Sequence, residues 1–107
     1  MAGNVQEVTD DTFTDFIQGD TPVLVDCWAP WCAPCRRLSP IIEELAGELK
    51  DEVKFGKLNT DENPSTAQQH GIMSIPTMLV YKGGEKVDVM IGALPKSEIL
   101  ATLRKYY

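Results

Sequence analysis

The segment from Val23 to Trp28 (VLVDCW) constrains the fold of this chain more than any other. Apart from Asp26, every residue in it is apolar, and valine and tryptophan favour extended backbone. A run this apolar is typical of a central strand buried on both faces, which requires helices on both sides of the sheet. We therefore expect an α/β protein built around this strand.

The remaining segments alternate between strand and helix patterns. Further strands are predicted at residues 5–8, 53–58, 77–81 and 86–91, and helices after Asp10 or Asp11, from Pro34 to Leu49, from the Asn63-Pro64 cap to His70-Gly71, and from Pro95 onward. Gly83-Gly84 marks a hairpin between the last two strands. The predicted order is βαβαβαββα in one domain, residues 1–107. Strands separated by helices should be parallel and the closing hairpin antiparallel, which gives a mixed five-stranded central sheet with helices on both faces.

Bulk properties exclude several classes of partner. Ten Lys and Arg face sixteen Asp and Glu, a net charge of -6, whereas nucleic-acid binding needs a basic surface. No apolar run approaches the roughly 20 residues of a membrane span, and the N-terminal segment MAGNVQEVTDD lacks the apolar core of a secretory signal. Three cysteines are too few for a disulfide-stapled secreted scaffold. We expect a reducing, cytoplasmic setting without nucleic-acid or membrane partners.

Two cysteines, Cys32 and Cys35, stand where the central strand is followed by the long helix. Two intervening residues allow an intramolecular disulfide if the backbone is helical or turn-like. At the helix N-terminus, unpaired N–H groups and the macrodipole lower the thiol pKa of Cys32 and favour the thiolate, which is the attacking species. Cys35 lies one turn deeper, so we expect it to be less exposed and to act as the resolving thiol.

Other roles for the cysteine pair stay open at this point. A structural zinc site usually takes four Cys or His ligands, and only Cys27 and His70 remain as further candidates. Cys27 lies among apolar residues and is expected to be a small buried hydrophobe, and His70 the C-terminal residue of a short helix. A binding module without redox turnover is a second alternative. Neither a metal nor a cofactor is expected.

The motif Trp31-Cys32-Ala33-Pro34-Cys35, with Asp26 before it and Ile75-Pro76-Thr77 far downstream, resembles the thioredoxin family. The resemblance covers essentially the whole chain, including Trp28, Pro40, Lys57, Gly84 and Gly92. It implies the thioredoxin fold and a protein dithiol–disulfide oxidoreductase in which Cys32 attacks, Cys35 resolves and a thioredoxin reductase restores the dithiol. That reductase is either an NADPH-dependent flavoprotein or ferredoxin-linked. The other partners are disulfide-containing target proteins, and we expect a monomer.

Asp26 is the carboxylate within the apolar strand. Alternation places it on the same face as Leu24 and Trp28, and burial without a partner raises its pKa. The resemblance assigns it the role of proton acceptor for Cys35, while a strand-end Asp that reaches solvent is the alternative. Lys57, on a neighbouring strand, could lie near Asp26 and oppose the rise in its pKa, or could simply be exposed.

Further residues are expected to form the substrate surface. Trp28 is expected in the core with an indole hydrogen bond, and Trp31 at the surface. The resemblance implies a cis bond before Pro76, which would present the Ile75 backbone to an extended peptide. The expected substrate-binding residues are Trp31, Ala33, Pro34, Ile75, Pro76, Gly92 and Ala93.

Ala33 departs from the family pattern, which usually has glycine at that position. Alanine favours helix, so the local fold should tolerate it. Arg36 takes a place often held by lysine and keeps its charge. The acidic residues Asp51, Glu52, Asp61 and Glu62 are expected to form a solvated surface.

Overall fold

The computed structural model describes residues 3–107 and has the predicted order of strands and helices. Met1 and Ala2, the start of the predicted domain and of the polar N-terminal segment, lie outside the described residues. The elements are β1 (Val5–Glu7), α1 (Phe13–Phe16), β2 (Val23–Trp28), α2 (Ala33–Glu48), β3 (Lys54–Asn59), α3 (Pro64–Gln69), β4 (Thr77–Lys82), β5 (Glu85–Ile91) and α4 (Lys96–Leu103). Among the described residues, no helix is both long and apolar enough to cross a membrane.

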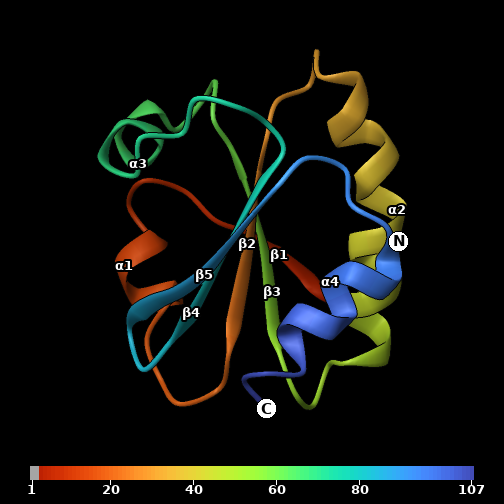
Figure 1. Ribbon diagram of the computed structural model, residues 1–107. Coiled ribbons are helices and arrows are strands. Elements are labelled where there is room, and N and C mark those ends of the chain that lie inside the picture. The colour runs from red at the N-terminus through yellow and green to blue at the C-terminus, as the bar shows by residue number, and fades with distance from the viewer. Residues whose placement is uncertain (1–2) are drawn as a thin grey trace.

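The strands form one sheet in the order β1-β3-β2-β4-β5, with β2 at its centre (Figure 1). β3 is parallel to both β1 and β2, and β5 is antiparallel to β4. Gly83 and Gly84, which join β4 to β5, both have positive φ angles, 64° and 79°. A two-residue hairpin turn of the favoured primed type needs positive φ at both positions, so the hairpin prediction is confirmed.

The prediction that strands separated by helices are parallel is wrong for β4. This strand follows α3 but pairs with β2 in the antiparallel direction, with Met78 opposite Asp26. A six-residue helix such as α3 spans about 9 Å, and a six-residue strand about 20 Å, so α3 does not return the chain to the far end of the sheet. β4 therefore begins at the edge where β2 and β3 end, as Figure 1 shows.

Alternation along β2 divides the core into two layers. Leu24 faces the layer covered by α2 and α4, where Leu38 and Ile99 are fully buried. Val25 and Cys27 face the other layer, which is covered by α1. Each face of the sheet buries a separate apolar cluster, so the prediction of a mixed sheet with helices on both faces is confirmed.

Neither Asp10 nor Asp11 caps α1, contrary to the prediction, because the N-cap residue of this helix is Thr12. Asp10 lies beside the start of α3 instead. Its carboxylate accepts hydrogen bonds from the backbone N–H groups of Ser65 (3.2 Å) and Thr66 (2.8 Å), in the first turn of α3. Asn63 is the N-cap residue of α3, as predicted, with Pro64 directly after it, and its side chain accepts a hydrogen bond from the Asp10 backbone N–H at 2.9 Å rather than from α3. The cause is the parallel pairing of β1 with β3, since the loops that follow parallel neighbours meet at one edge of the sheet.

Gly56 allows α1 to pack closely against β3. A Cβ atom at this position would lie 2.7 Å from the Phe16 ring and 2.7 Å from a methyl group of Val8. Both neighbours are buried core side chains with little room to shift. Glycine is therefore required here by the close approach of another element.

Gly56→Ala is expected to lower the free energy of unfolding by about 1–3 kcal/mol, because the added methyl group overpacks this contact. Chemical denaturation followed by tryptophan fluorescence measures the change. Gly47→Ala is the matched control: Gly47 is exposed within α2, and its nearest neighbour would lie 3.8 Å from the new Cβ. The control should be neutral or stabilising, because alanine favours helix. Equal stability of Gly56→Ala and wild type would show that the contact is not tight.

Candidate active site

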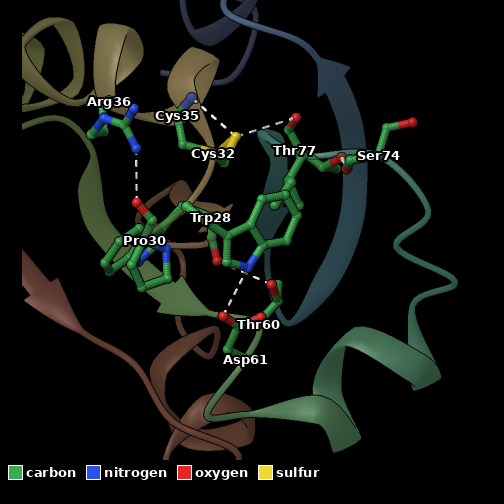
Figure 2. The surroundings of a disulfide bond; sticks show 11 residues. Trp28, Pro30, Cys32, Cys35, Arg36, Thr60, Asp61, Ser74 and Thr77 are labelled. Carbon is green, nitrogen blue, oxygen red and sulfur yellow. Dashed lines mark hydrogen bonds between the residues drawn. A yellow bond between two sulfur atoms is a disulfide. The ribbon is translucent and has the colours of Figure 1, made fainter.

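Cys32 and Cys35 are joined by a disulfide at the N-terminus of α2, and their Cα atoms lie 5.2 Å apart (Figure 2). Cys32 is the N-cap residue and has an extended backbone conformation, and Ala33 and Pro34 begin the helix. Proline fits there because its missing N–H group would have no helical partner. The backbone N–H of Cys35 donates to the sulfur of Cys32 at 3.2 Å. This bond and the helix dipole favour negative charge on Cys32 in the reduced protein.

Both cysteines are largely covered by protein. Cys32 is 4% exposed and Cys35 2%, so the order of exposure agrees with the prediction although the difference is small. The sulfur of Cys32 lies 3.7 Å from the carbonyl oxygen of Ile75. An incoming disulfide can therefore meet the Cys32 sulfur only in close contact with the surface around Ile75.

Of the residues expected to form the substrate surface, Ile75 lies beside the Cys32 sulfur, and Pro76 next to it is buried. The Ile75–Pro76 bond is cis, as the resemblance implied. Gly92 donates its backbone N–H to the carbonyl of Pro76 at 2.8 Å, which ties the end of β5 to the start of β4. Ala33 and Ala93 are exposed, and Pro34, Ile75 and Gly92 are half-buried.

The indole hydrogen bond expected for Trp28 is found at Trp31 instead. Trp31 is 68% exposed, and its Nε1 donates to Asp61 Oδ2 at 2.9 Å. Trp28 is half-buried, and its Nε1 has no hydrogen-bond partner among the described residues, so the predicted Trp28 hydrogen bond is wrong. The loop after β3 bonds to the carbonyl of Trp28 through Thr60 and turns the Asp61 carboxylate toward Trp31. Asp61 is thus not only a solvated surface charge.

Asp26 is 4% exposed, and its Oδ1 has no hydrogen-bond partner within residues 3–107. Burial raises its pKa from the ordinary 3.8 to about 7, and the positive charge of Lys57 partly opposes the rise. Lys57 is the direct register neighbour of Asp26 on β3 and is half-buried. A strand-end Asp26 that reaches solvent is thereby ruled out.

Asp26 and Cys35 line the same small cavity. The cavity has a volume of about 90 Å³ and is enclosed by Asp26, Trp28, Cys35, Arg36, Ser39 and Lys57. Arg36 is not a free surface charge, because its guanidinium donates to the Pro30 carbonyl at 2.9 Å and so closes the loop before α2 (Figure 2). The sequence held no signal for this bond, since it depends on where the loop carbonyl points.

The two other candidate metal ligands are used elsewhere. Cys27 is fully buried, and burial, with the nearby Asp26 charge, raises its thiol pKa to about 12, so it has the properties of a small hydrophobe. His70 follows α3, and its two ring nitrogens bond to the Thr66 carbonyl (2.9 Å) and the Tyr81 hydroxyl (2.6 Å). Within residues 3–107, no three Cys, His, Asp or Glu side chains are grouped so that they could hold a metal ion.

Comparisons with known proteins point to one family. The family model described as Thioredoxin matches residues 4–105. A chloroplastic M-type thioredoxin of Chlamydomonas reinhardtii is 54% identical over 100 residues, 92% of this chain and 71% of that protein. A thioredoxin of Synechocystis sp. is 50% identical over 101 residues, 94% of each chain. The solved structure of a Malassezia sympodialis thioredoxin, described as a member of a pan-allergen family, is 35% identical, with a TM-score of 0.89 over 97% of this chain and 91% of that one.

Asp26→Asn is expected to raise the free energy of unfolding at pH 8 but not at pH 4. The folded state keeps the Asp26 proton up to pH about 7, whereas the unfolded chain releases it near 3.8. The contribution of this proton to the free energy of unfolding is therefore complete below pH 3.8, the pKa in the unfolded chain. It is lost as the pH rises through about 7, the pKa in the folded state, a change on the order of 4 kcal/mol. Urea titrations of both proteins across this range measure it. A difference between the two proteins that does not vary with pH would contradict the buried proton.

Proposed function

The chain belongs to the thioredoxin family and is a dithiol–disulfide oxidoreductase, and from this we propose that Cys32 is the nucleophile and Cys35 the resolving thiol in the reduction of target disulfides. The observation that carries the proposal is the disulfide between them at the start of α2. It is the oxidised product that the reaction would leave behind.

In the first step, the Cys32 thiolate attacks one sulfur of the target disulfide. A bond forms between Cys32 and that sulfur, the target S–S bond breaks, and the other target sulfur leaves as a thiolate. The position of Cys32 as N-cap and the N–H of Cys35 that points at its sulfur support this assignment. The same two features favour the charged form of Cys32 over the neutral thiol.

In the second step, Cys35 attacks the Cys32 sulfur of the mixed disulfide. The Cys32–Cys35 bond forms, and the second target sulfur leaves as a thiolate, so the target gains two electrons and the protein loses two. Cys35 must first give up its proton. We assign Asp26 as the acceptor, because it lines the same cavity and its pKa of about 7 suits proton transfer near neutral pH. Lys57 moderates that pKa through its charge.

The substrate surface proposed for this reaction consists of Trp31, Ala33, Pro34, Ile75, Pro76, Gly92 and Ala93. Three of these residues support the proposal most directly. The Ile75 carbonyl lies beside the Cys32 sulfur, the Gly92 N–H bonds to the loop that carries Ile75, and the Trp31 ring is held at the surface by Asp61. A target segment that reaches Cys32 would lie in extended form over the Ile75 backbone.

Recycling of the oxidised protein requires a reductase, as is general in the family. We propose that this reductase is a separate protein, NADPH-dependent or ferredoxin-linked, and that the chain acts as a monomer of one domain, residues 1–107, without a bound cofactor. Cysteine usage supports a cytoplasmic location. The name of the Chlamydomonas relative adds a plastid as the alternative. Reduction by each purified reductase in turn, followed through tryptophan fluorescence, distinguishes the two electron donors.

Replacing either active-site cysteine by serine is expected to stop turnover at a different stage. Cys32→Ser should reduce insulin disulfides no faster than the dithiothreitol that drives the assay, because no attacking thiolate remains. Cys35→Ser should accumulate a mixed disulfide with the target that mass spectrometry detects, because the resolving thiol is missing.

Cys27→Ala is the matched control for these variants. Cys27 is a buried thiol on the opposite face of the sheet and should not affect turnover. Turnover by Cys32→Ser would refute the assigned nucleophile. Full biological function of a Cys32→Ser/Cys35→Ser double variant would favour a binding module without redox chemistry.

A further inference from the structure

We propose that a groove beside the disulfide, between β5 and the loop from α3 to β4, selects targets in which the reducible cysteine is flanked by apolar side chains and a carboxylate. The inference rests on the proposed function and adds a substrate preference to it. The groove is not part of the substrate surface described above, and most of the residues that form it were not singled out by their sequence pattern.

The groove has a volume of about 200 Å³ and lies on the face of the sheet opposite α2 and α4. Register fixes which strand residues form it. Leu79 of β4 pairs with Val89 of β5, and Thr77 pairs with Ile91, so these four side chains share one face. The loop residues 70–74, with Met73 at the rim, form the opposite wall.

The side chains around the groove are apolar and exposed to an unusual degree. Met73 is 95% exposed, Ile91 61% and Val89 42%. Single exposed apolar residues are common, but a cluster that surrounds one depression is typical of a binding surface. Met90, which points to the other face of the same strand, is 6% exposed. The two most exposed apolar side chains of β5, Val89 and Ile91, therefore both line the groove.

The groove is continuous with the reaction site. Ser74 and Thr77, which line it, flank the Ile75–Pro76 segment whose carbonyl lies 3.7 Å from the Cys32 sulfur. Val89 lies two residues along β5 from Ile91, or about 7 Å further from the disulfide. A target chain that crosses Ile75 with its cysteine at Cys32 therefore places residues adjacent to that cysteine in the groove.

Charge determines which occupant fits. Lys86 lines the groove and is its one Lys or Arg among the described residues, so a carboxylate on the occupant has a partner there. A second copy of this chain is a poor occupant, because two chains that each carry a net charge of -6 repel one another.

The edge of β5 is partly blocked, which restricts how the target lies. The Tyr106 hydroxyl donates to the Val87 carbonyl, and the Asp88 carboxylate accepts the Val89 N–H. Strand addition to this part of the edge would have to displace both bonds. The target is therefore held through its side chains in the groove.

The test uses two short peptides, each dimerised through one disulfide. The first has Leu, Val and Glu around its cysteine, and the second has Ser and Lys in their place. The wild type should reduce the first with a kcat/KM on the order of tenfold higher, because at least one aliphatic side chain is buried in the complex. Met73→Ser, alone and combined with Val89→Thr, should bring the ratio toward one, and Lys86→Glu should lower it by removing the partner of Glu.

The matched control is Val87→Thr. Val87 is exposed on the same strand, 37%, but does not line the groove, and this variant should keep the wild-type ratio. Met73 is almost fully exposed, so a change caused by its replacement does not arise from unfolding. Equal kcat/KM for both peptides in the wild type, or an equal effect of Val87→Thr and Met73→Ser on the ratio, would overturn the proposal. If the wild type reduces neither peptide nor hydroxyethyl disulfide, it is the proposed function that fails.

Discussion

The position of β2 at the centre of the sheet determines where every working group of this thioredoxin lies. β2 pairs along its length with β3 on one side and β4 on the other, and both of its faces are buried. Because β2 and β3 run parallel and β4 runs against them, the end of β2, the loop after β3 and the start of β4 meet at one edge. Cys32, Asp61 and Ile75 come from these three segments. Their contacts thus follow from strand order.

The same central strand gives Asp26 its raised pKa. A carboxylate at an inward position of a buried strand loses its hydrating water, and no hydrogen bond from the described part of the chain to Oδ1 replaces it. The raised pKa lowers the stability of the native state above neutral pH, and it is the property on which the proposed role of Asp26 as proton acceptor for Cys35 depends. The two effects have one cause, so a change that stabilises the fold by removing Asp26 also removes the acceptor.

The sequence predicted the parts of this molecule that depend on local pattern. Each of these parts is specified by residues close together in the sequence: the apolar run of β2, the spacing that forms α2, the Gly83-Gly84 hairpin and the cysteine pair. The direction of β4 was not predicted correctly, because it depends on how far α3 carries the chain. The partners of Trp31 and Arg36, and the lack of one for the Trp28 indole N–H within residues 3–107, were missed for a related reason. Each depends on the course of a loop, which is set by the rest of the sheet.

The carboxylate of Asp10 links two parts of the chain that are 55 residues apart or more. A helix as short as α3 is marginal on its own in water, and its first turn takes hydrogen-bond acceptors from a residue that precedes β2 in the chain. α3 is therefore completed only when the N-terminal strand has docked onto β3. In a fragment that begins after Asp10, the first turn of α3 lacks both of these acceptors, and α3 leads directly into the loop that carries Ile75. The N-terminal segment thus supports, through α3, a loop that contacts the disulfide.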